Sequence, residues 1–167
     1  MQHILNNVLK LVQKYGTNDP FEIAEQLKVT VLFHKLGSLK GYYTYDRRFR
    51  YIVINCILEE GMQRIICAHE LGHDRLHQHY AKYSPLNDIT LYDMTSKPER
   101  EANLFAAELL LPDDEVFAGL NSTYSFHTLA NVLKIPLELL DFKIQILKKK
   151  GYHFAAPLQA RGDFLKN

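Results

Sequence analysis

This chain of 167 residues has few features that mark a secreted, membrane or nucleic-acid-binding protein. Its only cysteines are Cys56 and Cys67, which predicts two buried, reduced thiols in a cytoplasmic protein, although the sequence leaves a disulfide between them open. No apolar run approaches the length needed to cross a bilayer, and we expect no signal peptide because Met1 leads directly into an amphipathic helix. The formal net charge of +1 gives no reason to expect non-specific binding to nucleic acid or membranes.

The composition that remains is that of a small globular protein. Hydrophobic residues make up 47% of the chain and charged residues 23%, and the length is sufficient to bury a core. No internal repeat or low-complexity tract is present. We therefore expect a single domain over residues 1–167, with residues 162–167 frayed at its end.

The most informative segment is HELGH at residues 69–73, which has the H-E-x-x-H pattern of zinc hydrolases. An α-helix advances about 100° per residue, so His69 and His73 share one face and both rings can reach one metal ion. Glu70 lies about 100° round from His69, close enough to hold a water at that metal without being a ligand. The spacing therefore predicts a catalytic zinc centre, provided that the segment is helical.

The surrounding residues favour that helix. Apolar side chains and the two histidines recur at intervals of three and four, which is the spacing of one buried helical stripe. Gly61 is a plausible start, and no proline follows until Pro85. Gly72 costs this helix about 1 kcal/mol relative to alanine, so we expect another backbone or a substrate to approach closely there.

A catalytic zinc ion usually has three protein ligands, so a third must come from elsewhere. His79 has the spacing of a metzincin ligand, but that arrangement needs a glycine at position 76, where Leu76 favours a continued helix. In such a helix His77 and His79 each point about 80° away from His69. The spacing therefore disfavours His79, suggests that His77 contacts a ligand or the substrate, and leaves a carboxylate on a later helix.

Residues 98–111 predict this later helix, with Ser96 as its N-cap and Pro112 at its end. Its expected apolar face consists of Ala102, Phe105, Ala106 and Leu109, and the small alanines allow a neighbouring helix to come close. Glu101 lies at the border of that face, so we expect Glu101 to be the third ligand, with Glu108 open as an alternative. Glu99 is expected to be a solvated acid in the first turn.

Periodicity and turn residues predict an α+β fold. The expected helices cover residues 4–15, 20–27, 61–80, 98–111, 113–120, 126–133 and 136–150, and the expected strands cover 29–33, 42–45 and 50–55, with a loop over 81–97. The last two strands form a hairpin turning at residues 46–48. We expect the segment 41–55 either to offer a sheet edge to an extended peptide substrate or to be an ordinary core strand.

Three blocks together resemble the ImmA/IrrE family of metallopeptidases: AHELGH at 68–73, LH at 76–77 and EANLFAAELLLP at 101–112. GYY at 41–43 and YIVIN at 51–55 resemble the hairpin before the active helix of that family, and the resemblance covers roughly residues 20–155. It implies a zincin-like fold in which a small antiparallel sheet packs on the HExxH helix, with further helices at the C-terminus. It also implies Zn2+ bound by His69, His73 and Glu101, with Glu70 as catalytic acid and base.

The resemblance further implies a cytoplasmic zinc endopeptidase with a narrow regulatory substrate, typically a helix-turn-helix repressor of a phage or mobile element. Glu70 would take a proton from a zinc-activated water and deliver it to the leaving amine. The alternative is a non-catalytic transcriptional or stress regulator that retains a structural metal site. We do not expect a membrane partner or direct nucleic-acid binding, although residues 126–133 and 136–150 faintly resemble a helix-turn-helix.

Overall fold

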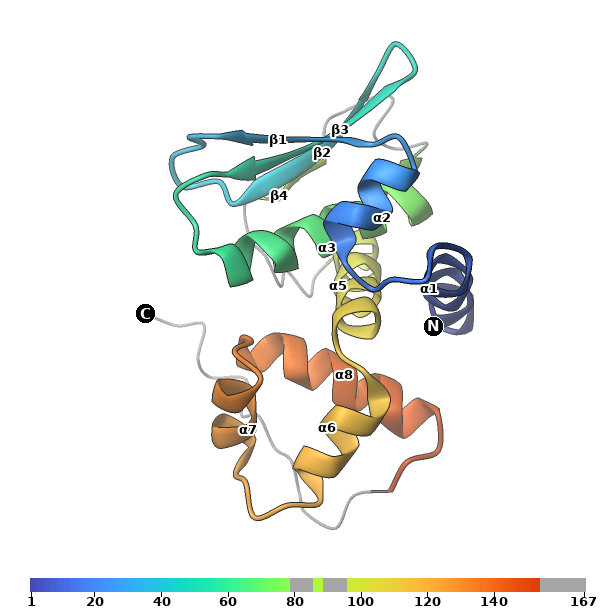
Figure 1. The fold of residues 1–167 in the computed structure, drawn as a ribbon, viewed down its shortest axis with the longest axis vertical. Coiled ribbons are helices and arrows are strands. Elements are labelled where there is room, and N and C mark those ends of the chain that lie inside the picture. The colour runs from blue at the N-terminus through green and yellow to red at the C-terminus, as the bar shows by residue number, and fades with distance from the viewer. Residues whose placement is uncertain (79–85, 89–95, 154–167) are drawn as a thin grey trace. The chain divides into compact units, whose positions relative to one another are not determined.

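The computed structural model describes residues 1–78, 86–88 and 96–153 (Figure 1). The predictions that concern His79 and residues 162–167 lie outside this range. By its internal contacts the chain divides into two compact units, Met1–Leu110 and Leu111–Asn167. The single domain expected over residues 1–167 stays a prediction. No helix among the described residues has both the length and the apolar character needed to span a membrane.

The first unit contains a sheet of four strands in the order β1-β3-β2-β4. The strands are β1 (Thr30–His34), β2 (Gly41–Asp46), β3 (Phe49–Asn55) and β4 (Leu86–Asp88). β1 runs parallel to β3, whereas β2 is antiparallel to both β3 and β4. The sheet is therefore mixed rather than purely antiparallel as expected, and β4 forms within the segment expected to be a loop.

Two short-range signals set the first helices. α1 (Gln2–Tyr15) ends at Gly16, whose φ of 70° is the left-handed conformation that glycine adopts without a steric penalty. α2 (Pro20–Gln26) begins after Asp19, whose side chain accepts hydrogen bonds from the N–H groups of Phe21 and Glu22. Both helices were predicted, and the proline at the first position of α2 is where a missing N–H costs nothing.

Two helices of this unit, α3 (Glu60–Leu76) and α5 (Lys97–Leu110), pack against each other. Gly72 allows the backbones of the two helices to approach closely, because a Cβ at this position would lie only 3.1 Å from Ala102 Cα and 3.3 Å from Ala102 O. The expected approach of a second backbone at Gly72 is therefore confirmed. α3 also packs on β2 and β3, so it lies between the sheet and α5.

α3 ends at Leu76, and His77 caps it with a hydrogen bond from its N–H to His73 O. The prediction that Leu76 would continue the helix was wrong. At the start of α5, Ser96 Oγ accepts the Glu99 N–H at 3.3 Å, which confirms the predicted cap.

The second unit contains α6 (Asp113–Leu120), α7 (Phe126–Val132) and α8 (Leu137–Lys149), each within one residue of its predicted bounds. Ser125 caps α7 by accepting the Thr128 N–H at 3.1 Å. Asp113, at the start of α6, forms ion pairs with Lys143 at 2.5 Å and Lys150 at 2.7 Å. Lys143 is 1% exposed, so this pair holds α8 to the first turn of α6.

The two cysteines differ in exposure. Cys67 is buried in α3, as expected, whereas Cys56 is exposed just beyond the end of β3. Both are free cysteines in the structure, and the expected burial of Cys56 was wrong. A residue that follows a strand leaves the alternation that would have turned its side chain inward.

Candidate metal centre

α3 places His69 and His73 one turn apart on its buried side, at 0% and 1% exposure. Their Nε2 atoms are 3.1 Å apart, and their ring centroids are 4.9 Å apart. Two nitrogens bound to one zinc ion at 2.0–2.1 Å in tetrahedral geometry lie about 3.3 Å apart. The separation in this structure therefore fits two imidazole ligands of one ion.

Glu99 of α5 completes the cluster. Its Oε2 lies 3.2 Å from His69 Nε2, and its Oε1 lies 3.4 Å from His73 Nε2. One donor atom from each of the three residues lies within 4.8 Å of the others, and this is the only such group of His, Cys, Asp or Glu among the described residues. The set of two imidazoles and one carboxylate matches that of many catalytic zinc sites.

The structure does not bring Glu101 to this cluster, and the expectation for Glu99 as a solvated acid was wrong. The side chain of Glu99 is 17% exposed and faces both imidazoles. On a helical wheel Glu99 lies about 60° from Ala102, whereas Glu101 lies about 100° from it on the other side. Because α5 turns its alanine face toward Gly72, the closer of these two positions reaches the histidines.

Further hydrogen bonds orient the two rings. His69 Nδ1 lies 2.9 Å from Asn103 Oδ1, and Asn103 is four residues after Glu99 on the same face of α5. His73 Nδ1 lies 3.1 Å from His77 Nδ1, and His77 Nε2 lies 3.1 Å from Glu101 Oε2. The Nδ1 atoms of both rings are thus engaged by neighbours, while both Nε2 atoms point to Glu99.

The electrostatics favour the protonation states that a metal needs. Burial lowers the pKa of His73 to about 4, so this imidazole is neutral near pH 7. Burial alone would raise the pKa of Glu99, but hydrogen bonds from His69 and His73 bring it well below its usual range. Neutral imidazoles and an ionised carboxylate are the forms that bind a divalent cation, so the residues present fit a zinc ion.

Glu70 lies beside the cluster rather than in it. Its side chain is buried, and a Cβ on Gly41 would lie 3.6 Å from Glu70 Oε1, so the carboxylate faces the start of β2. Gly41 leaves this space because its own Cβ would also contact Ile66 of α3 and lie 3.0 Å from Val53 O. Glu70 thus lies at the contact between α3 and β2 and is not part of the donor group.

A second buried group fixes the orientation of α3 against the sheet. Asp74 accepts a hydrogen bond from the Tyr43 hydroxyl at 2.9 Å and two from Arg50 Nη1 at 3.1 Å. Arg50 also donates to the carbonyl oxygen of Leu27 at the end of α2. Burial, together with the Asp74 charge, raises the pKa of Tyr43, which therefore remains a neutral donor. These contacts tie β2, β3 and α2 to the residue next to His73.

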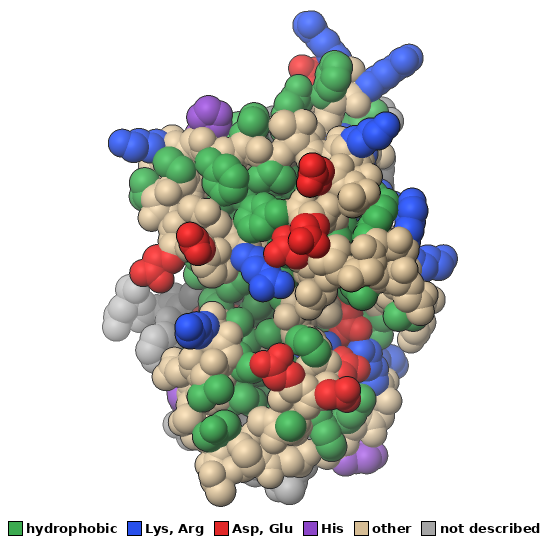
Figure 2. Space-filling view, viewed as in Figure 1, with side chains coloured by type: hydrophobic (Ala, Val, Ile, Leu, Met, Phe, Trp, Pro, Cys, Tyr) green, Lys and Arg blue, Asp and Glu red, His purple; other side chains and the backbone are tan. Residues whose placement is uncertain are grey.

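Of the two expectations for segment 41–55, the ordinary core strand holds for most of its length. β3 is interior, and Gly41, Tyr42 and Tyr43 of β2 pair with β4, so this part of the hairpin is not an edge. Only residues 44–46 of β2 lack a second neighbour among the described strands. At the opposite edge, Figure 2 shows hydrophobic side chains on the surface where β1 runs, and Leu32 and Phe33 are exposed there.

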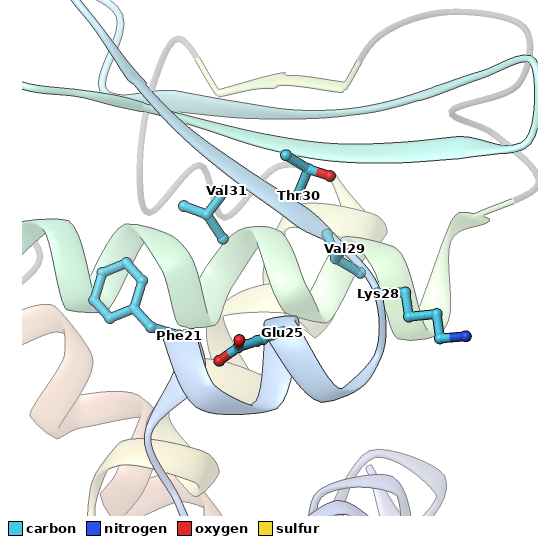
Figure 3. A pocket seen from close by; sticks show the side chains of 6 residues that line it. All are labelled: Phe21, Glu25, Lys28, Val29, Thr30 and Val31. Atoms are coloured by element: carbon cyan, nitrogen blue, oxygen red, sulfur yellow. The ribbon is translucent and has the colours of Figure 1, made fainter.

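A shallow pocket lies between α2 and β1 and is separate from the cluster (Figure 3). It is lined by Phe21, Glu25, Lys28, Val29, Thr30 and Val31. None of these residues belongs to the group formed by His69, His73 and Glu99. The pocket offers one carboxylate and one ammonium group above an apolar floor, and it shows no arrangement of catalytic groups.

The two residues that sequence reasoning missed share one signal. Glu99 and Asn103 are four residues apart, and Ala102 lies between them on the face that packs against Gly72. A carboxylate and an amide spaced as i and i+4 on the small-residue face of the second helix would have identified both. The alternative ligand Glu108 is not part of the group.

Comparisons with known proteins place the chain in a family. The sequence pattern of the IrrE N-terminal-like domain, a peptidase family, matches residues 24–145, a range that includes both α3 and α5. "Uncharacterized immunity region protein 2" of Bacillus phage phi105 is 38% identical over 137 residues, which is 81% of this chain and 85% of that protein. "Metallopeptidase ImmA" of Bacillus subtilis strain 168 is 28% identical over 143 residues, covering 84% of this chain and 83% of that protein.

Proposed function

Because this chain belongs to the ImmA/IrrE family of metallopeptidases, whose IrrE N-terminal-like domain it contains, we propose that it is a zinc-dependent endopeptidase with a zincin-like fold. The observation that carries the proposal is the convergence of His69, His73 and Glu99 from two helices, with their donor atoms within 4.8 Å of one another. His69, His73 and Glu99 would bind the zinc ion. Glu101, expected as a ligand from the sequence, would not.

In this proposal Glu70 is the catalytic acid and base. Zinc held by the three residues would polarise the attacking water and the carbonyl of the scissile bond. Glu70 follows a ligand directly in α3, so its carboxylate stays next to the reacting atoms without occupying a ligand position. It would take the proton of the attacking water and then deliver it to the leaving amine nitrogen.

The proposed substrate is a regulatory protein, most simply a helix-turn-helix repressor of a phage or mobile element, cut in the cytoplasm so that transcription is induced. One relative is named as an immunity region protein of a phage, which supports a role in the control of such an element. Cys56 and Cys67 are both free, which is consistent with a reducing compartment.

The test uses the full chain and a candidate helix-turn-helix repressor, chosen as the one whose gene lies nearest to the gene of this chain. We expect the zinc-loaded protein to cut that repressor at one position, read by mass spectrometry, and a chelator to stop the cleavage. Glu70→Gln should retain one zinc ion per chain and lose cleavage by at least about a hundredfold, as expected when a general base is removed.

Two results would contradict the proposal. If metal analysis finds no zinc in the parent chain, so that the parent and His69→Ala do not differ, the proposed metal centre is wrong. A biological effect that survives Glu70→Gln would favour a non-catalytic regulator that keeps a structural metal.

A further inference from the structure

A chain of hydrogen bonds leads from His73 away from the proposed metal. His73 Nδ1 lies 3.1 Å from His77 Nδ1, and His77 Nε2 lies 3.1 Å from Glu101 Oε2. His77 is 3% exposed and the Glu101 side chain is 17% exposed, so both contacts are largely shielded from water. Glu101 therefore meets the cluster through His77 and not directly.

The direction of these bonds follows from the zinc site. If His73 keeps the lone pair of Nε2 for zinc, its proton lies on Nδ1 and must be donated. The acceptor is His77 Nδ1, which leaves the His77 proton on Nε2, facing the Glu101 carboxylate. One arrangement of protons thus satisfies both of these bonds, and it is the arrangement in which His73 can bind zinc.

The other oxygen of Glu101 is engaged elsewhere. Glu101 Oε1 lies 3.7 Å from His3 Nε2 of α1 and 4.0 Å from Lys97 Nζ. Contacts on both oxygens turn this carboxylate away from the His69 and His73 pair, which explains why it is absent from the donor group.

We propose that His77 and Glu101 are positioning residues that hold His73 in its zinc-binding tautomer and ring orientation. The inference rests on the proposed zinc site and gives a positioning role to two residues that do not bind the zinc themselves. The two imidazole ligands then differ in the hydrogen-bond acceptor of their Nδ1–H groups. His69 donates to the neutral amide of Asn103, whereas His73 donates to the His77 imidazole, which itself donates to the Glu101 carboxylate. A carboxylate behind a ligand histidine fixes the ring and raises its basicity.

The experiment measures the zinc dissociation constant of the full chain by competition with a chromophoric chelator. His77→Leu should weaken zinc binding by about 10- to 100-fold, the usual effect of losing a partner of a ligand histidine. Glu101→Ala should weaken it less, by up to about tenfold. Because Glu101 acts through His77, the double variant should bind zinc no more weakly than His77→Leu alone.

Conservative variants separate positioning from a general loss of structure. His77→Gln offers one acceptor and one donor, so it should recover most of the affinity lost in His77→Leu. Glu101→Gln can still accept the His77 proton, so it should bind zinc nearly as the parent chain does. Glu108→Ala on the same helix is the matched control, and we expect its zinc affinity to be unchanged.

The outcomes can be told apart. If Glu101→Gln loses zinc as completely as Glu99→Gln, Glu101 is a direct ligand and the positioning role is wrong. If His77→Leu and Glu101→Ala both bind as tightly as the parent chain while Glu99→Gln does not, the inference fails and the zinc site stands. If Glu99→Gln also has no effect, the proposed zinc site itself fails.

Discussion

Replacing Gly72 with alanine tests the contact that brings the two ligand-bearing helices together. The new Cβ would lie 3.1 Å from Ala102 Cα, 3.2 Å from Phe105 Cβ and 3.3 Å from Ala102 O. None of these atoms is the end of a flexible side chain, so α5 must shift as a whole by a few tenths of an ångström. Any such shift also moves Glu99 away from the two histidines, because Glu99 is part of the same helix.

Two effects of opposite sign decide the stability of Gly72→Ala. Alanine favours the helix by about 1 kcal/mol relative to glycine. Overpacking at a tight contact costs about 1–3 kcal/mol. We therefore expect the free energy of unfolding, measured with urea on the zinc-free protein, to fall by about 0–2 kcal/mol. Zinc affinity, measured by chelator competition, should fall as well.

Gly61→Ala is the matched control on the same helix. Gly61 lies in the first turn of α3, and a Cβ there meets nothing within 4 Å. Only the difference in helix propensity between glycine and alanine remains, so the free energy of unfolding of this variant should rise by up to about 1 kcal/mol and its zinc affinity should be unchanged. The reasoning would be refuted if Gly72→Ala gained as much stability as Gly61→Ala and bound zinc as tightly as the parent chain.

Three further predictions concern the second unit and the thiols. Asp113→Asn leaves the buried Lys143 ammonium without that carboxylate and should cost about 2 kcal/mol in urea unfolding, whereas Lys143→Met should be nearly neutral. Burial favours a raised pKa for Asp113, but hydrogen bonds from its lysine partners hold that pKa below its usual range. Since the folded-state pKa is the lower one, the stabilisation is complete above about pH 4 and is lost as the pH falls through the folded-state value, so Asp113→Asn should show a weaker loss of stability in acid. A thiol reagent should modify exposed Cys56 in the native protein and buried Cys67 only after unfolding, and equal rates would contradict the assigned burial.

Local sequence determined those parts of the protein that depend on neighbouring residues. His69 and His73 share a face because their spacing matches the helical period, and the structure needs no distant contact to achieve this. The same holds for the starts of α2 and α5, where Asp19 and Ser96 satisfy backbone N–H groups of the first turn. Gly72 could also be interpreted correctly, since an interior glycine indicates a close neighbour.

The choice of the third carboxylate depended on how α5 is rotated against α3. Glu99 and Glu101 lie on the same turn, and the sequence offers both as acids near the start of a helix. The packing of Ala102 against Gly72 sets that rotation and directs Glu99 to the histidines, leaving Glu101 to His77. A helical period fixes the angle between two side chains of one helix but not the angle of the helix to its neighbour.

Strand pairing likewise depended on contacts between segments that are far apart in the chain. β4 joins β2 across some forty residues of intervening chain, and nothing in the short segment at 86–88 indicates which strand it will meet. The parallel pairing of β1 with β3 is likewise a contact between distant segments. The sequence by itself determined the pair of histidines and the helix that carries them, because these are local. The tertiary structure alone decided which acid faces them, because that depends on contacts between surfaces whose residues are far apart in the chain.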